Sequence, residues 1–216
     1  MTTRRRAVTE DERGTAAERT RERILRAALE EFGAKGYSGA RTAAIAARAG
    51  VNQQLISYHF GGKQGLLAEL RRRWNETQAA LPPPESSFAD SFAAVLDATL
   101  ERPQWARMVL WQALGDDPGD GGGMSSAQRE QLRGGIERLR RRQRDGEISD
   151  VPSPEFVMLL AYALTFAPLA LPDHVAAILG VDPLSEDYRR IAHEQLMALL
   201  RGPAPASDGA CRPQGA

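Results

Sequence analysis

Cysteine is almost absent from this chain of 216 residues: the single Cys211 lies near the C-terminus among Gly, Pro, Ala and Ser. One cysteine excludes a disulfide framework within one chain and a cysteine-rich zinc site, and it suits the reducing cytoplasm, where we expect the protein. The first residues carry no apolar run of the kind found in secretory signals. The longest mostly apolar stretch, Phe156 to Leu171, is about one turn shorter than a membrane span, so it predicts a buried helix and no membrane partner.

The sequence motifs of common enzyme classes are also missing. The three histidines have no metal-ligand spacing, no glycine-rich phosphate loop follows a strand, and there is no Gly-x-Ser-x-Gly turn. Asp116, Asp117 and Asp120 lack the alternating ligands of a calcium loop. We therefore expect no enzyme activity, no metal and no cofactor.

The formal net charge is zero, but the charge is unevenly distributed. Up to Asn75 there are 15 basic and 8 acidic residues, hence +7, and beyond it 13 basic and 20 acidic residues, hence −7. A basic segment joined to an acidic one indicates that the first meets an anion such as DNA and that the second has another role.

Apolar residues recur at three- and four-residue spacing and nowhere alternate with period two, which predicts an all-α fold. Thr15 and Glu18 predict a capping box that opens the first helix, and Gly36 predicts its end. Further helices are expected at residues 42–49, after Asn52 to 60, 62–78, 88–101, 103–114, 125–144, 154–171, 172–179 and 185–201.

Three consecutive prolines within Leu81 to Ser87 predict a domain boundary or a sharp corner. We expect an N-terminal domain at residues 15–80, including its fourth helix, and a second helical domain at residues 81–201. Residues 1–14 and 202–216 are expected to be disordered tails, and the glycine-rich residues 115–123 a mobile loop. The cluster Arg4 to Arg6 either enters a minor groove or is a solvated tail.

The window Thr42 to Lys63, TAAIAARAGVNQQLISYHFGGK, has the spacing of a helix-turn-helix. Counting Thr42 as the first position, the small Ala46 is at five, Gly50 in the turn at nine, and the apolar Ile56 at fifteen. The spacing alone fits a structural corner between two helices as well as a DNA-binding motif.

Four pieces in order extend this motif: I-L-x-A-A-x-x-x-F from Ile24, K-G-Y from Lys35, I-A-x-x-A-G-V from Ile45 and Y-x-F-x-x-K from Tyr58. With them, the stretch from Arg19 to Trp74 closely resembles the DNA-binding domain of the tetracycline-repressor (TetR) family of transcriptional regulators. The resemblance implies an N-terminal three-helix helix-turn-helix domain and a C-terminal helical bundle that binds an effector and dimerises.

The resemblance also implies which residues meet DNA: Arg41, Thr42, Gln53, Gln54, Ser57, Tyr58, His59 and Lys63. The hydroxyl of Thr42 would hold a phosphate at the second helix, and the glutamines would pair with adenine. Lys63 would clamp the DNA backbone, whereas His59 either contacts phosphate or only packs. Two departures from the family pattern are Ala43, where a base-reading Arg or Thr is common, and Gly61, Gly62 and Gly65 around Lys63, which predict a weak start of the fourth helix.

The second domain carries large apolar residues that either form an ordinary core or line an effector pocket. The candidate pocket residues are Phe92, Trp105, Met108, Trp111, Met158, Tyr162 and Phe166. The apolar stripes of the last two long helices predict a dimer interface, formed by Leu159, Leu160, Ala163, Ala167, Tyr188, Ile191, Leu196 and Leu199.

Together, these observations predict a homodimeric regulator, most simply a repressor, that binds a near-palindromic double-stranded operator and is released by a hydrophobic or aromatic small molecule. The effector would tilt the fourth helix and so change the spacing of the recognition helices. The alternatives are an effector-independent DNA-binding protein, an activator, and an all-helical enzyme.

Overall fold

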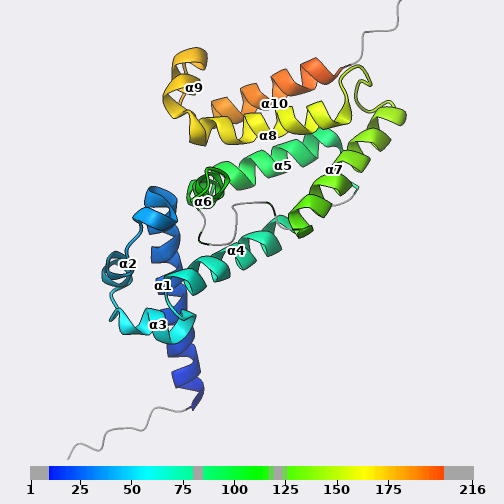
Figure 1. Ribbon diagram of the computed structural model, residues 1–216. Coiled ribbons are helices and arrows are strands. Elements are labelled where there is room, and N and C mark those ends of the chain that lie inside the picture. Colours follow the sequence, from blue (N-terminus) through cyan, green and yellow to red (C-terminus); the bar gives the residue numbers. More distant parts are fainter. Residues whose placement is uncertain (1–9, 80–84, 117, 119–123, 125, 202–216) are drawn as a thin grey trace, which may run out of the picture.

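The computed structural model describes residues 10–79, 85–116, 118, 124 and 126–201, and its regular structure in these ranges is entirely helical (Figure 1). The helices are α1 (Glu10–Gly39), α2 (Thr42–Ala49), α3 (Gln54–Phe60), α4 (Lys63–Ala79), α5 (Phe88–Leu100), α6 (Pro103–Ala113), α7 (Ser126–Arg144), α8 (Pro154–Ala170), α9 (Pro172–Leu179) and α10 (Glu186–Leu200). The bounds of α2 and α9 are those predicted, and the bounds of α3 to α8 and α10 differ from prediction by a single residue at one or both ends. The all-α prediction is confirmed.

The start of α1 corrects the sequence-based prediction. The helix begins at Glu10, so Thr15 lies inside it and the predicted capping box does not open it. Residues 10–13 are Glu, Asp, Glu and Arg, whose helix propensity carries the helix across Gly14. The predicted tail is therefore wrong for residues 10–14, and residues 1–9 and the tail 202–216 lie outside the described residues. The predicted break at Gly36 is present, with φ 69° and ψ −177°.

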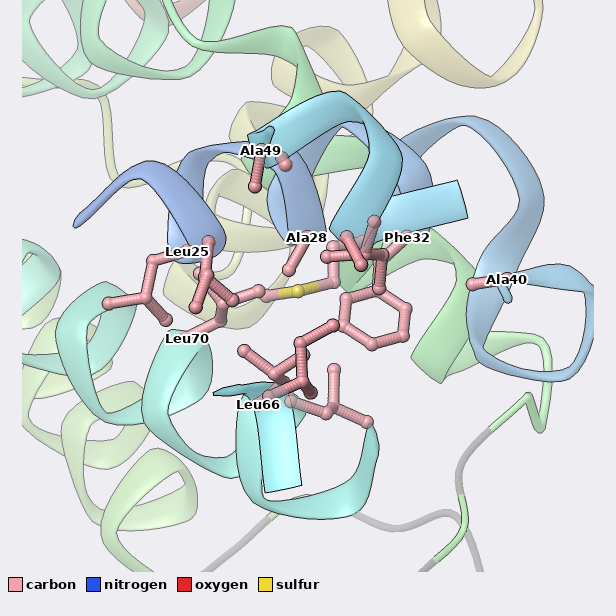
Figure 2. Packing of buried hydrophobic residues seen from close by; sticks show 14 residues of the cluster. Leu25, Ala28, Phe32, Ala40, Ala49, Leu66 and Leu70 are labelled. Carbon is pink, nitrogen blue, oxygen red and sulfur yellow. The ribbon is translucent and has the colours of Figure 1, made fainter. Parts of the chain in front are cut away.

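Helices α1 to α4 enclose the first hydrophobic core, part of which is shown in Figure 2. Its buried residues are Ile24, Leu25, Ala27, Ala28, Phe32, Ala40, Ile45, Ala46, Ala49, Ile56, Leu66, Leu67, Leu70 and Met108. Met108 is on α6, beyond the proline corner, and it enters this core because α6 packs closely along α1. Met108 therefore joins the first core from the C-terminal side of the boundary predicted near residue 80.

The second core is built by α5, α6, α7, α8 and α10. Its buried apolar residues are Phe88, Phe92, Leu96, Leu100, Ala106, Leu139, Ile148, Val157, Leu169, Tyr188, Ala192, Leu196 and Leu200. Helices α8 and α10 run side by side in opposite directions, on the side of the bundle away from α1 to α3 (Figure 1). The Tyr188 hydroxyl on α10 donates to the Leu164 carbonyl of α8 at 2.6 Å, which ties the two helices together.

No single helix among the described residues has both the length and the apolar character needed to cross a membrane. Helices α8 and α9 reach that length and apolar character only when they are taken together, and the two helices are bent by 104° relative to each other.

Candidate DNA-binding site and cavity

The turn between α2 and α3 has the geometry of a helix-turn-helix. Gly50 follows α2 with φ 63° and ψ 42°, a left-handed conformation that glycine adopts without steric cost. The Arg23 guanidinium of α1 donates to the carbonyls of Ala49 and Gly50, each at 3.0 Å, and so satisfies acceptors left free where α2 ends. Helix α1 therefore fixes the position of the turn.

The start of α2 is held by a buried carboxylate. Arg41 is the N-cap of α2, but its own side chain makes no capping bond. Instead, Glu31 of α1, which is 1% exposed, accepts a hydrogen bond from the Arg41 backbone and pairs with Lys35 at 2.7 Å. The hydrogen bond from Lys35, together with the Arg41 backbone and the charge of Arg48, lowers the pKa of Glu31 despite its burial. The Arg41 side chain is left exposed toward solvent.

The exposed face of α3 carries the predicted base-reading residues. Gln54, Ser57 and Tyr58 are exposed, and Tyr58 has an exposed fraction of 81%. Gln53 is the N-cap of α3, one residue outside the helix, and its Nε2 donates to the Thr42 hydroxyl at 2.9 Å. This bond leaves the Gln53 amide oxygen free to accept a hydrogen bond, for example from the N6 amino group of adenine.

His59 and Lys63 are half-buried rather than fully exposed. The His59 ring packs edge-on against Tyr58, with 5.0 Å between the centroids, and the Lys63 ammonium lies 4.4 Å from the centre of the Tyr37 ring. The structure thus gives both residues packing roles. The motif K-G-Y contains Tyr37, but sequence reasoning missed its contact with Lys63, because the two residues are far apart in the chain.

An ion network joins α1 to α4 beside α3. Glu69 of α4 pairs with Arg21 of α1 at 3.0 Å and with Arg72 and Arg73 of its own helix at 2.9 and 3.2 Å. The Arg21 guanidinium also lies 4.7 Å from the centre of the Phe60 ring, at the end of α3. The orientation of α3 therefore depends on α1 and α4 together.

A second connection links the helix-turn-helix to the bundle through α6. The Trp111 indole Nε1 donates to the Gly33 carbonyl at 3.2 Å. The Asp116 carboxylate, just after α6, accepts from the Ser38 backbone at 3.0 Å and from its hydroxyl at 2.5 Å. Burial opposes ionisation of Asp116, but these bonds lower its pKa overall. Asp116, the second residue of the mobile loop predicted at residues 115–123, is therefore anchored, while residues 117 and 119–123 lie outside the described residues.

A cavity of ≈ 260 Å³ lies between α4, α5, α6, α7 and α8. Of the predicted pocket residues, Phe92, Met158, Tyr162 and Phe166 line it. The prediction is wrong for Trp105, Met108 and Trp111, because α6 turns these side chains toward α1 and α4. Met108 is in the first core, Trp105 stacks on Trp74 at 5.7 Å, and Trp111 bonds to Gly33.

Among the lining residues that were not predicted are Trp74 and Asn75 of α4 and Arg138 and Arg142 of α7. Helix α7 ends in the arginine-rich sequence RLRRRQR, so charge alone does not reveal which arginines face inward.

The residues predicted to form a dimer interface differ in their exposure to solvent. Tyr188 and Leu196 are 2% and 0% exposed inside the bundle's own core, so their assignment to an interface is wrong. Leu160, Ala167 and Ile191 are half-buried, and Ala163 is exposed. Leu159 and Leu199 are 65% and 68% exposed, so α8 and α10 present an apolar face to solvent.

Within the described part of the chain, no three His, Cys, Asp or Glu side chains gather where they could hold a metal ion. The candidate functional features of the described chain are therefore the exposed face of α3 and the cavity.

Two family models match the chain: "Bacterial regulatory proteins, tetR family" over residues 24–70 and "Tetracyclin repressor-like, C-terminal domain" over residues 89–198. The HTH-type transcriptional repressor SCO4008 of Streptomyces coelicolor is 30% identical over 153 residues, which are 69% of this chain and 79% of that protein. The HTH-type transcriptional repressor NicS of Pseudomonas putida is 30% identical over 110 residues, 47% of this chain and 52% of NicS.

Among solved structures, a transcriptional regulator of Streptomyces coelicolor, SCO4942, superposes with a TM-score of 0.67 at 24% identity, covering 85% of this chain and 99% of that one. The likeness to this structure shows the fold alone. The two family models match the sequence of both cores. The chain is therefore a helix-turn-helix transcriptional regulator that belongs to the TetR family.

Proposed function

We propose that the protein is a ligand-responsive repressor, which binds a near-palindromic operator as a homodimer and is released by a small molecule in the cavity. The observation that carries this proposal is that one helix, α4, packs against the recognition helix at one end and lines the cavity at the other. The names of SCO4008 and NicS, both repressors, support the sign of regulation.

The DNA side of the proposal rests on the exposed polar face of α3 and the start of α2. Gln53, Gln54, Ser57 and Tyr58 would read base edges in a major groove. Thr42, Arg41, His59 and Lys63 would contact phosphates, which position the protein without reading sequence.

Coupling between the cavity and α3 has a physical route. Trp74 lines the cavity and stacks on Trp105, which packs against the first core. A ligand that favours one position of α4 over another would therefore also favour one position of α3, and by linkage DNA would oppose that ligand.

A two-fold dimer formed through the apolar face of α8 and α10 would present two recognition helices to the DNA. Two equivalent α3 helices require two equivalent half-sites, so the operator would be a near-palindrome. A regulator that works on chromosomal DNA in this way would act in the cytoplasm of a bacterium.

Selection of bound DNA from a random pool tests the proposal first, because a specific, near-palindromic site should emerge. Affinity for that site, measured by fluorescence anisotropy, should fall steeply with salt because phosphate contacts release counterions. An affinity that every small molecule leaves unchanged would favour an effector-independent DNA-binding protein, and failure to select any site would contradict the repressor itself.

Two substitutions then separate base reading from phosphate binding. Gln53→Ala should weaken the selected site by about 1–3 kcal/mol and leave random DNA nearly unchanged, whereas Lys63→Ala should weaken both alike. If both variants lose affinity equally for all sequences, the assignment of Gln53 to base reading is wrong.

A further inference from the structure

The cavity has a charge opposite to that of the domain that contains it. Residues after Asn75 carry a net charge of −7, yet the charged residues that line the cavity are Arg138 and Arg142, with no Asp or Glu among the described lining residues. Much of the remaining lining is apolar, including Phe92, Met158 and Phe166. A positive potential inside an apolar cavity selects for negative charge.

Arg142 already has partners within the protein. Its Nε lies 3.5 Å from a Glu147 carboxylate oxygen, its Nη2 donates to the Ser91 hydroxyl at 3.0 Å and to the Ser86 carbonyl, and its guanidinium lies 6.0 Å from the centre of the Phe88 ring. Burial lowers the pKa of Arg142, and the charges of Arg138 and Arg141 lower it further. Arg142 thus contributes a fixed, compensated charge at one end of the cavity.

Arg138, one turn earlier on α7, differs from Arg142. It is half-buried, and its guanidinium makes no hydrogen bond or ion pair with any part of the chain that the structure describes. Other arginines of α7 are paired, for example Arg133 with Glu130 and Arg140 with Glu137 and Glu155. Because the Arg138 guanidinium has no partner in the described chain, its N–H donors are available to an anion that enters the cavity.

We propose that the effector is an amphipathic organic anion, a carboxylate or sulfonate on an apolar body, whose anionic group pairs with Arg138. The apolar body would lie against Phe92, Met158 and Phe166, and the Asn75 amide offers a further hydrogen bond. A planar guanidinium binds such an anion in a bidentate manner, which fixes the ligand's orientation relative to Trp74 of α4. This inference rests on the proposed function, because it names the ligand class of the same cavity.

Two fluorescent probes of one skeleton test it: anilinonaphthalene sulfonate, which is anionic, and phenylnaphthylamine, which lacks the sulfonate. Binding of each is titrated with the whole protein, with Arg138→Gln, and with Arg141→Gln, an exposed arginine of the same helix that does not line the cavity. Ala161→Phe, which fills the cavity wall, shows whether a probe binds there. Circular dichroism melting checks that each variant folds.

We expect the sulfonate to bind at one site per chain and Arg138→Gln to weaken it roughly ten- to a hundredfold, as for a lost charge-assisted hydrogen bond. Arg141→Gln should leave its affinity within about twofold, phenylnaphthylamine should not respond to Arg138→Gln, and Ala161→Phe should abolish both.

Three other outcomes overturn the inference in different ways. If both probes bind in the cavity equally well and Arg138→Gln affects neither, the anion preference is wrong but a ligand-responsive repressor stands. If sulfonate binding survives Ala161→Phe, the probe binds elsewhere and the cavity does not select anions. If neither probe binds, ligand responsiveness through this cavity fails as well.

Discussion

At the residue scale, Tyr188 compensates for a proline inside a helix. Pro168 lies within α8 and has no N–H, so the Leu164 carbonyl four residues earlier has no donor in its own helix. The Tyr188 hydroxyl supplies that donor at 2.6 Å, from a position that is 2% exposed. Sequence reasoning placed Tyr188 in a dimer interface because it belongs to the apolar stripe of its helix. Such a stripe has the same spacing whether it packs against the same chain or against a second copy.

Tyr188→Phe should lower the free energy of unfolding by about 1–3 kcal/mol, because a buried carbonyl is left without a donor. Urea denaturation measures this, with Tyr162→Phe as the control, since the Tyr162 hydroxyl has no hydrogen bond in the described part of the chain. A loss in the control as large as in Tyr188→Phe would contradict the assigned role.

The same residue predicts a dependence on alkaline pH. Burial raises the pKa of Tyr188 from about 10 to about 12, so the folded state keeps the hydroxyl protonated where the unfolded chain ionises it. The stabilisation is fully present below pH 10 and is lost as the pH rises toward 12. Tyr188→Phe should show a smaller loss of stability across this interval than the unaltered protein.

At the element scale, Glu69 holds α1 against α4. Hydrogen bonds from Arg72, Arg21 and Arg73 lower its pKa from 4.5 to about 2, although burial acts in the opposite direction. The folded pKa is below the unfolded one, so this stabilisation is present above about pH 4.5 and is lost as the pH falls toward 2.

Glu69→Gln should therefore lower the free energy of unfolding by about 1–3 kcal/mol at pH 7 and flatten its decline between pH 4.5 and 2. Denaturant titrations at several pH values measure both effects. Glu76→Gln is the matched control on α4. The Glu76 carboxylate is 62% exposed and, within the described residues, forms its one ion pair with Arg72, so the change should alter stability by less than about 0.5 kcal/mol. Equal effects of the two substitutions would refute a specific role for Glu69.

The packing of α1 against α6 depends on the absence of a side chain at Gly33. A Cβ there would lie 2.9 Å from the Gln104 carbonyl oxygen, closer than two such atoms normally approach. Because backbone atoms cannot move aside as a side chain end can, a larger residue would push the helices apart and disturb Met108 and the Trp111 hydrogen bond.

Gly33→Ala should lower the free energy of unfolding by about 1–2 kcal/mol, even though alanine favours helix. Gly134→Ala, the same change in α7, where a Cβ has only an ordinary contact at 3.6 Å, should raise it by about 0.5–1 kcal/mol. Thermal melts of both variants decide the matter, and stabilisation by Gly33→Ala would show that the α1–α6 contact is not tight.

At the scale of the whole molecule, α8 and α10 lie on the side opposite the helix-turn-helix (Figure 1), and each exposes a leucine, Leu159 and Leu199. In the dimer proposed above, the double variant Leu159→Glu with Leu199→Glu places four charges into the two-fold interface, so it should be monomeric by light scattering. Loss of the second recognition helix should also weaken operator binding by roughly a hundredfold or more. Leu114→Glu, a change at an 80% exposed residue after α6, should remain dimeric, and a double variant that stays dimeric would contradict the interface.

The sequence by itself determined the helices and the exposed polar face of α3, because both depend on local signals. Apolar periodicity, together with the helix-ending Gly and Pro residues, predicted the bounds of α2 to α10 to within a residue. The spacing of Ala46, Gly50 and Ile56 predicted the buried side of the helix-turn-helix, and so the exposed face of α3 that carries Gln54, Ser57 and Tyr58. The start of α1 was predicted wrongly, because a capping signal at Thr15 competes there with the helix propensity of the preceding residues.

The tertiary structure alone decided what each apolar stripe packs against. An apolar stripe says that a helix face is buried but not what covers it, so Met108 and Trp111 were predicted in the cavity and lie against the first domain, and Tyr188 was predicted at an interface and lies in the core. For the same reason, only the fold shows that α7 turns Arg138 into the cavity, because one arginine in an arginine-rich helix looks like the next until its neighbours in space are known.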